Sequence, residues 1–282
     1  MKRKEIAEET LRIQRQGFYV YKGRRVEFAT AQKHSEENSE LITPEHGESL
    51  VRGIAGLPRL PQGAACFVTN EPTVKAILDF AETGKGRVGV LNFASAKNPG
   101  GGFLNGAMAQ EESLAVSSGL YETQMRNESY YKANRAWKSM MYTNHAIYSP
   151  DVVFFRDQRF DLIERPVTAS VLTLPAVNYG QVLLKGEDPR KAEWMMKDRM
   201  RLALAIFAKK GDINLILGAY GCGVFRNEPM KVAGWWHELL EDEGLGLLFS
   251  EIRFAVLDTS KEGKCIHAFE KKFNGHSNIM AD

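Results

Sequence analysis

The amino-acid sequence predicts one α/β domain of three layers, with a sheet between two sets of helices. Strand-like apolar runs alternate with helical segments along the chain of 282 residues, which is the pattern of α/β proteins. Residues 65–94 follow the order strand, helix, strand, which favours a parallel sheet covered on both faces. Residues 188–217 add a long helix with one apolar face and then a buried strand. No internal repeat or low-complexity linker interrupts the chain, so we expect a single domain over residues 1–282.

The first elements are a helix and a hairpin. Residues 3–16 carry apolar side chains among charged ones and predict a helix that Gly17 ends. Phe18–Tyr21 and Arg25–Phe28 flank a short turn and predict a β-hairpin. Residues 29–57 are polar, and we expect them to be helical in part.

The remaining elements are predicted from periodicity and turn residues. The predicted strands are 65–69, 88–94, 142–148, 152–155, 170–175, 213–217 and 252–257, and the predicted helices are 72–83, 111–137, 188–210, 228–241 and 261–273.

Composition excludes several classes of protein. With 37 basic and 35 acidic residues the net charge is +2, which implies no direct affinity for nucleic acid. The start of the chain lacks the apolar core of a signal peptide, and no run of about 18 apolar residues predicts a membrane span. Three cysteines lie far apart without a C-x-x-C pair, which argues against a disulfide framework. We expect a cytoplasmic protein that does not bind membranes.

Two glycine-rich loops share one context, an apolar strand before and a helix after. Gly100–Gly102 follow the strand 88–94, and Gly218–Phe225 follow the strand 213–217. Loops at the carboxyl ends of neighbouring strands form the crevice where open α/β sheets bind ligands. Backbone N–H groups and helix N-termini suit a diphosphate. Tight turns alone would also explain the glycines, but the presence of both loops favours phosphate binding.

Better-known nucleotide and metal motifs are incomplete. The second loop is close to G-x-G-x-x-G, but Arg226 occupies the place of the third glycine, and no P-loop occurs. His237 begins half of a zincin motif, in which Glu241 replaces the second histidine. The six histidines form no metal-binding spacing, so we expect neither a metal nor a cofactor.

Nucleophilic catalysis has little support. Ser113 and Ser149 lack a G-x-S-x-G context. Cys222 lies in the second loop, where a small buried side chain is the simpler interpretation.

Glu111 and Glu112 are the candidate catalytic residues. Acids in the first turn of a helix are favourable by about 0.3–1 kcal/mol, so the pair alone has a structural explanation. The helix dipole lowers a carboxylate pKa, whereas burial and a bound diphosphate raise it. Successive helix residues point about 100° apart, so we expect two different roles. The sequence leaves open which glutamate faces the reacting bond.

The spacing of these motifs is similar to a known signature. Gly100-Gly101-Gly102, seven residues and then Gln110-Glu111-Glu112 resemble the GGG-x(6–8)-QEE pattern of poly(ADP-ribose) glycohydrolases. Residues 91–99, 218–229, 6–17 and 68–71 also resemble the bacterial branch of that family, which consists of a macrodomain alone. The resemblance implies a macrodomain with a mixed central sheet and an N-terminal helical extension.

The resemblance also implies an activity. It predicts hydrolysis of the O-glycosidic ribose–ribose bonds of poly(ADP-ribose), without a metal or cofactor and acting from chain ends. Glu112 would be the catalytic acid that protonates the leaving oxygen and then activates water. Glu111 would hold and orient the ribose on the leaving side.

The implied partners are poly(ADP-ribose) or ADP-ribosylated proteins. The glycines would wrap the diphosphate, Phe225 would pack on the adenosine side, Asn98 would contact the distal ribose, and Asn70 or Glu71 would meet adenine. The expected substrate-binding residues are Asn98, Gly100, Gly101, Gly102, Gln110, Gly221, Cys222, Gly223, Val224 and Phe225.

Two alternatives stay open on the same scaffold. One is a hydrolase that removes single ADP-ribose groups from a protein or nucleic acid. The other is an ADP-ribose-binding module without turnover, against which the intact Glu111-Glu112 pair argues, because recognition of a diphosphate needs no acid.

Overall fold

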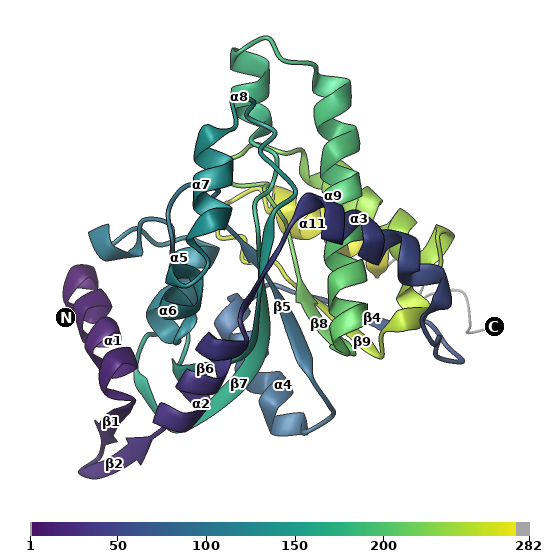
Figure 1. Ribbon diagram of the computed structural model, residues 1–282. Coiled ribbons are helices and arrows are strands. Elements are labelled where there is room, and N and C mark those ends of the chain that lie inside the picture. Colours follow the sequence, from purple (N-terminus) through teal and green to yellow (C-terminus); the bar gives the residue numbers. More distant parts are fainter. Residues whose placement is uncertain (1, 275–282) are drawn as a thin grey trace.

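The computed structural model describes residues 2–274 and, within them, one large mixed sheet with helices on both faces (Figure 1). In spatial order the strands are β3 (Glu40–Ile42), β6 (Ala146–Arg156), β7 (Leu162–Leu174), β5 (Val88–Phe93), β8 (Asn214–Leu217), β9 (Glu251–Ala255) and β4 (Ala65–Thr69). The strands β7, β5, β8, β9 and β4 run parallel, while β6 is antiparallel to both of its neighbours. The predicted three-layer fold and the mixed sheet implied by the resemblance are confirmed.

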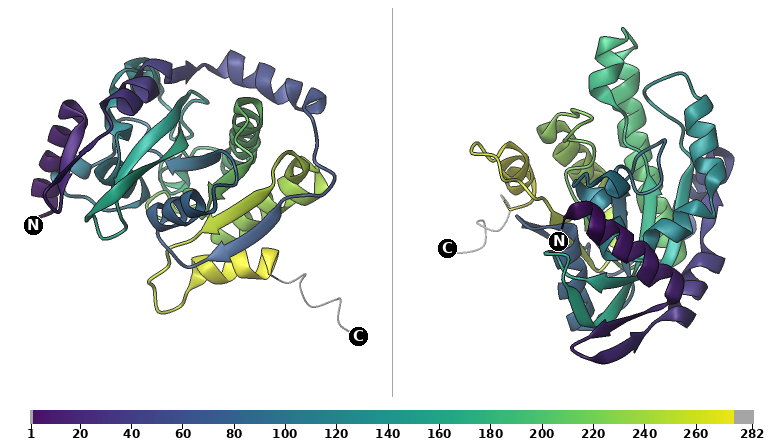
Figure 2. Two further views of the ribbon diagram at one scale, coloured as in Figure 1. Left: turned by 90° about the horizontal axis from the view of Figure 1, so that it is seen from below. Right: turned by 90° about the vertical axis from the view of Figure 1, so that its left-hand side faces the viewer.

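The central strands are apolar on both faces because helices cover both. In β8, Leu215 and Leu217 belong to one core cluster and Ile216 to the other, as expected when alternate side chains leave opposite faces. The helices of the first cluster are α9 (Pro189–Lys210), α10 (Pro229–His237) and α11 (Lys264–Phe273), and those of the second are α4 (Thr73–Thr83), α5 (Gln110–Ser117) and α6 (Leu120–Met125). Figure 2 shows this layering from two further directions.

Helix α9 confirms its predicted apolar face. Ala192, Met196, Met200, Ala203 and Phe207, spaced by three or four residues, are all buried. The outer side of α9 packs against α3 (Pro44–Gly53).

The N-terminal helix and hairpin are also confirmed. They are α1 (Arg3–Gln16), β1 (Phe18–Tyr21) and β2 (Arg24–Glu27), and α2 (Ala29–Asn38) follows. The inner face of α1 is tied to the end of α5, because Thr10 Oγ1 donates to Val116 O at 2.7 Å and Gln14 Nε2 donates to Ser118 O at 2.7 Å. Helix α1 therefore holds the C-terminal end of α5 in place.

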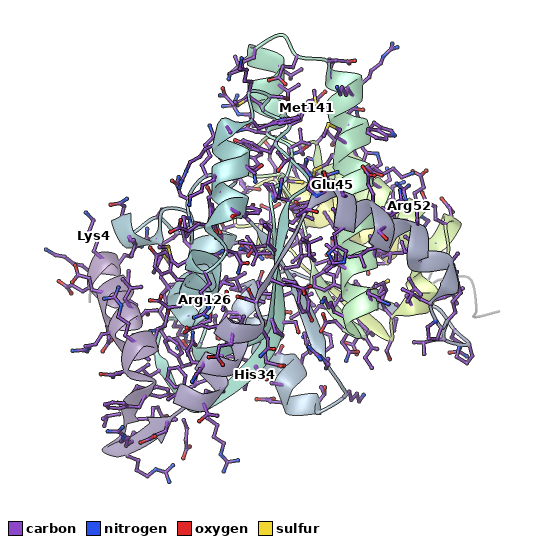
Figure 3. All side chains as sticks on the ribbon, viewed as in Figure 1. Lys4, His34, Glu45, Arg52, Arg126 and Met141 are labelled. Atoms are coloured by element: carbon purple, nitrogen blue, oxygen red, sulfur yellow. The ribbon has the colours of Figure 1, made fainter. Side chains whose placement is uncertain are left out.

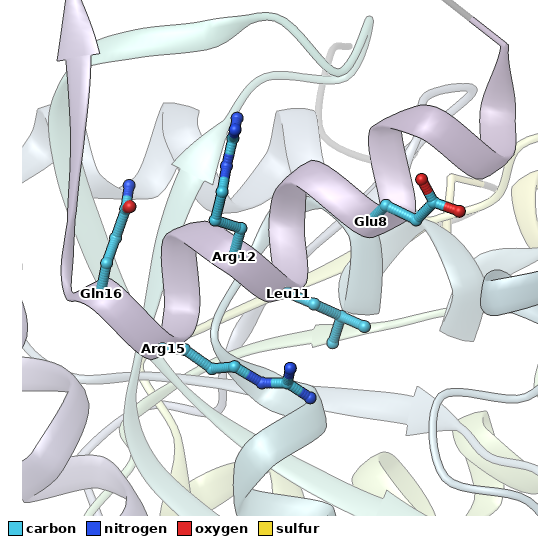
Figure 4. A pocket seen from close by; sticks show the side chains of 5 residues that line it. All are labelled: Glu8, Leu11, Arg12, Arg15 and Gln16. Carbon is cyan, nitrogen blue, oxygen red and sulfur yellow. The ribbon is translucent and has the colours of Figure 1, made fainter.

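The outer side of α1 carries a shallow hollow. Figure 4 shows Leu11 and Arg15 on one side of the helix, with Arg12 and Gln16 extending to the other. The hollow is lined by residues of α1 alone, Glu8, Leu11, Arg12, Arg15 and Gln16, so it is separate from the glycine loops.

The prediction of one helix over 111–137 is wrong. The segment forms three helices, α5, α6 and α7 (Glu128–Ala136). Ser118 is extended and pairs with Phe154, and Gly119 N donates to Val153 O at 2.9 Å. The backbone here bonds to strand β6 instead of continuing the hydrogen bonds of the helix. The helix propensity of the segment does not reveal this break, because the partner strand lies elsewhere in the sequence.

Several strand boundaries also differ from the prediction. Residues 142–145 precede the strand, and residues 146–148 and 152–155 belong to one strand, β6, with an irregularity in pairing where Asp151 has a φ of 49°. Strand β7 begins at Leu162 rather than near 170, and the short elements β3 and α8 (Tyr179–Leu184) were missed. Strand β3 exists through its pairing with β6, which is a long-range contact. Across the described part of the chain, no helix has both the length and the apolar character needed to cross a membrane.

Candidate active site

The two glycine loops leave neighbouring strands at the same edge of the sheet. Strands β5 and β8 are parallel and directly paired, with Val88 opposite Asn214 and Val90 opposite Ile216. The loops follow the carboxyl ends of these strands, so the predicted adjacency is confirmed. Both loops and the start of α5 lie at this edge, which is the edge at which open α/β sheets bind ligands.

The first loop needs glycine where it passes the two glutamates. Gly101 has a φ of +60°, and a Cβ there would lie 3.0 Å from Glu111 Oε2 and closer still to Glu112 Oε1. Gly100 has a φ of +63° and lies against the ring of Phe103. The missing side chains let the loop backbone pass directly over both carboxyl groups.

The carboxylate of Glu112 joins the loop to the start of α5. Its Oε1 accepts a hydrogen bond from Gly102 N at 2.9 Å, and its Oε2 accepts one from Ala109 N at 3.0 Å. The second bond caps the first turn of the helix. Glu112 is only half-buried, so its carboxylate lies on the glycine loop within reach of a ligand.

The carboxyl group of Glu111 is buried in a set of donors. Oε2 accepts from Ser95 N at 2.6 Å, and Oε1 accepts from Asn92 Nδ2 at 3.2 Å and Gln124 Nε2 at 3.1 Å. These donors favour the charged form, but burial outweighs them and raises the pKa of Glu111 to about 8. The raised pKa favours the protonated form of Glu111 over that of an ordinary glutamate near neutral pH.

Sequence reasoning missed three residues of this network. Gln124 accepts from Gly100 N at 2.8 Å and donates to Glu111 and, at 3.3 Å, to Thr173 Oγ1. Asn92 donates to the same hydroxyl at 3.1 Å. A polar residue inside the apolar strand 88–94 was the available signal for Asn92, whereas nothing around Gln124 distinguishes it in sequence.

Gln124→Leu is expected to loosen the first loop. The change leaves Gly100 N–H without its partner and removes one donor from Glu111, at a cost of about 1–3 kcal/mol for a buried unpaired group. We expect a lower free energy of unfolding, measured by urea denaturation, together with weaker ADP-ribose binding, measured by calorimetry. Unchanged binding and stability would contradict the bridging role of Gln124.

Gln110 joins helix α5 to strand β5, and its contact with substrate stays a prediction. Its Oε1 accepts from Phe93 N at 2.8 Å and its Nε2 donates to Leu91 O at 2.9 Å. Both ends of the amide therefore bind the backbone of β5. Gln110 positions α5 on the strand and leaves the two glutamates to face the loop.

The second loop is more open than the first. Gly221 has a φ of +72°, and a Cβ there would meet Asn227 and Ala176, whereas a Cβ on Gly223 would meet nothing within 4 Å. Val224 is 87% exposed, so its side chain makes little protein contact. This loop presents backbone to solvent.

Two side chains of the second loop are anchored. The ring of Phe225 lies 6.0 Å from that of Tyr142, and its carbonyl accepts from Gly180 N at 3.0 Å. Burial, with a smaller contribution from Cys265, raises the pKa of the Cys222 thiol well above its usual value. This favours the neutral thiol and agrees with a packing role.

The other predicted contacts are dispersed. Asn98 is exposed, and its backbone N donates to Ser95 Oγ at 3.1 Å. Asn70 follows β4, at the edge of the sheet, where its amide binds the backbone N and O of Asp258 at 3.0 Å each. Glu71 accepts from the Thr69 hydroxyl at 2.7 Å. Strand β9 separates β4 from β8, so Asn70 and Glu71 are not beside the glycine loops.

No group of three or more histidine, cysteine, aspartate or glutamate side chains among residues 2–274 could hold a metal ion.

A mixed sheet between helices, with two glycine loops and a buried and an accessible carboxyl group at one edge, defines a macrodomain enzyme. The model of one protein family, the catalytic domain of microbial-type PARG, matches residues 7–157. The chain belongs to this family, the microbial-type poly(ADP-ribose) glycohydrolases.

Solved structures agree with this membership. The poly(ADP-ribose) glycohydrolase of Thermomonospora curvata bound to the inhibitor ADP-HPD is 36% identical with a TM-score of 0.89, over 96% of this chain and 99% of that one. The Deinococcus radiodurans enzyme in complex with ADP-ribose is 40% identical with a TM-score of 0.80, over 86% of this chain and 96% of that one. A comparison with proteins of curated function gave no significant match.

Proposed function

We propose that this chain releases ADP-ribose from the ends of poly(ADP-ribose) by hydrolysing ribose–ribose bonds, with Glu112 as the acid–base residue. The observation that carries the proposal is the half-buried carboxylate of Glu112, hydrogen-bonded to Gly102 N within the glycine loop. A diphosphate held by this loop brings the adjoining ribose to that carboxylate.

Glu112 acts twice in the proposed reaction. It first donates a proton to the leaving ribose oxygen as the glycosidic C–O bond breaks and positive charge develops on the other ribose. It then accepts a proton from the water that attacks this centre. In the ligand-free protein its partners are both backbone N–H donors.

Glu111 supports this chemistry from its buried place beside Glu112. Because burial raises its pKa to about 8, it adds less negative charge there near neutral pH than an ordinary glutamate. It lies against the same glycine, since a Cβ on Gly101 would meet both carboxyl groups. We assign Glu111 to holding the ribose on the leaving side.

The loops supply the rest of the binding site. Gly100–Gly102 and Gly221–Val224 follow the carboxyl ends of adjacent strands and enclose the diphosphate. The three N–H groups of Gly100–Gly102 bond to Gln124, Asn98 and Glu112, so the backbone donors for the diphosphate come from the second loop. Phe225, fixed beside Tyr142, packs on the adenosine side. Asn98 is exposed at the start of the first loop and contacts the distal ribose.

A side-by-side assay on poly(ADP-ribose), mono-ADP-ribosylated protein and ADP-ribosylated DNA tests the substrate. We expect ADP-ribose to be released from polymer, as monomers from the first time point. Short oligomers as early products would contradict action from chain ends. Turnover of a mono-modified substrate alone would contradict the polymer as substrate.

The pKa of Glu111 predicts a pH dependence of stability. The folded-state pKa of about 8 lies above the ordinary value of 4.5, so the unfolded chain loses this proton first. The contribution to stability is complete below pH 4.5 and is lost as pH rises through 8, by at most about 1.4 kcal/mol per pH unit. Glu111→Gln removes this titration. The free energy of unfolding, measured in urea from pH 5 to 9, is expected to fall more steeply in wild type than in the variant, and parallel curves would contradict the assignment.

A further inference from the structure

Exposed cations and tryptophans gather on the helices that project beyond the glycine loops. Helix α8 and the first turns of α9 form the top of the molecule in Figure 1, with α7 beside them. We call this surface the cationic tip and define it by six exposed residues: Trp137, Lys138, Lys185, Arg190, Lys191 and Trp194. Trp137 is 50% exposed and Trp194 is 66% exposed, which is unusual for the largest apolar side chain.

The segments of the cationic tip are joined into one surface. Glu187, in the turn between α8 and α9, accepts hydrogen bonds from Met140 N at 3.0 Å and from Ser139 Oγ. Asn178 N donates to Met140 O at 3.0 Å. Met141, the next residue, lies close to this end of the molecule in Figure 3. The residues after α7 are therefore fixed against the α8–α9 turn.

The cations of the tip are not neutralised by the protein. Throughout residues 2–274, the side chains of Lys138, Lys185, Arg190 and Lys191 form no ion pair. Arg190 and Lys191 stand in the first turn of α9, where the helix dipole favours acidic side chains. Helix stability therefore does not explain why they are basic.

Nearby acidic side chains are engaged elsewhere. Glu187 binds the residues after α7, as above. Asp188 caps α9 by accepting from the backbone N of Arg190 and of Lys191. Glu193 pairs with Lys231 at 2.6 Å. The carboxylates of Glu187 and Asp188 keep their charges, but the four cations of the tip outnumber them, so the tip is a local positive surface on a chain whose net charge is only +2.

The cationic tip is connected to both glycine loops. The Arg135 guanidinium, at the end of α7, donates to the carbonyl of Lys97, the residue before Asn98. Gly180 N, in α8, donates to Phe225 O at 3.0 Å. These two contacts place the base of the tip against both glycine loops.

We infer that the cationic tip binds the part of a poly(ADP-ribose) chain that lies beyond the bond being cut. This inference rests on the proposed function, which makes that polymer the substrate. Each polymer unit carries a diphosphate and an adenine. Unpaired lysine and arginine side chains bind phosphates by releasing counterions, and exposed tryptophan faces stack on bases without sequence preference. The tip supplies both kinds of contact on one surface.

Binding to a Glu112→Gln background tests the inference without turnover. The triple change Lys185→Ala, Arg190→Ala and Lys191→Ala is expected to raise the Kd for long polymer about tenfold or more. It should reduce the slope of log K against log salt by about 2, at about 0.7 per lost contact. The Kd for free ADP-ribose should not change, because these residues lie outside the loops.

The matched control changes three exposed lysines far from the tip. Lys85→Ala, Lys209→Ala and Lys271→Ala remove the same charge, and Lys209 lies at the opposite end of α9. This variant should bind polymer as the parent does. Trp194→Ala should weaken polymer binding with no change in salt slope, because stacking releases no counterions.

Three results would overturn the inference: unchanged polymer affinity in the triple variant, an equal loss in the lysine control, or equal loss of ADP-ribose binding. In competition with labelled polymer, single-stranded DNA of equal charge is expected to be less effective than unlabelled polymer. Equal competition would overturn the assignment of poly(ADP-ribose) as the ligand of the tip. Release of ADP-ribose from polymer by the wild-type chain is measured separately. Absence of release would contradict the proposed function, whereas the polymer affinity of the variants tests the role of the tip.

Discussion

Glu112→Gln is expected to lower the rate of ADP-ribose release from polymer about 10³-fold while ADP-ribose still binds. Acid–base catalysis by one positioned side chain contributes about 10²–10⁴-fold, and an amide can neither donate nor accept the transferred proton. Single-turnover release of labelled ADP-ribose measures the rate, and calorimetry measures binding.

Glu112→Gln also lowers stability, and this effect has to be separated from the loss of acid–base catalysis. The amide of Gln can accept from only one of Gly102 N and Ala109 N, so one bond is lost at about 1 kcal/mol. Glu128→Gln is the matched control, since Glu128 is an exposed acid in the first turn of α7. Full activity of Glu112→Gln would contradict the mechanism, and loss of ADP-ribose binding would show that the loop itself had been disrupted.

Gly101→Ala is expected to reduce activity by about 10²-fold or more, although the substitution adds only a methyl group. The added Cβ would clash with the carboxyl oxygens of Glu111 and Glu112, and a displacement of about 1 Å costs that much in rate. A positive φ adds about 1–2 kcal/mol of strain. Steady-state kinetics and thermal denaturation measure the two effects.

Gly84→Ala is the control that separates backbone strain at a positive φ from displacement of the two carboxyl groups. Gly84 ends α4 with a φ of +62°, close to the +60° of Gly101, but a Cβ there meets nothing within 4 Å. We expect a similar loss of stability from φ in this variant with wild-type activity. Equal activity losses in the two variants would mean that the contact of Gly101 with the carboxyl groups is unimportant.

Sequence reasoning located the strands and long helices where local signals are strong. Helix α9 was predicted because its apolar residues recur at helical spacing, and α1 because Gly17 marks its end in the left-handed conformation. It failed where pairing overrides propensity, as at Ser118, whose extended backbone bonds to β6 in the middle of a predicted helix.

The candidate site was predictable in part because some of its features are local patterns in the sequence. Two glycine loops after apolar strands and a glutamate pair at fixed spacing are local patterns, and they indicated the correct edge of the sheet. The surroundings of each glutamate are not local. Gln124 reaches Glu111 from another helix and Thr173 approaches from another strand, so no spacing in the sequence reveals them.

The sequence by itself determined the α/β order, the two ligand loops and the residues that carry carboxyl groups, because these depend on residue type and short-range spacing. Only the tertiary structure decided how the two glutamates differ. Glu111 is enclosed by β5 and α6 and has a pKa of about 8, whereas Glu112 caps α5 and stays within reach of solvent. Burial and hydrogen-bond partners set the state of a carboxyl group, and both come from segments far away in the chain.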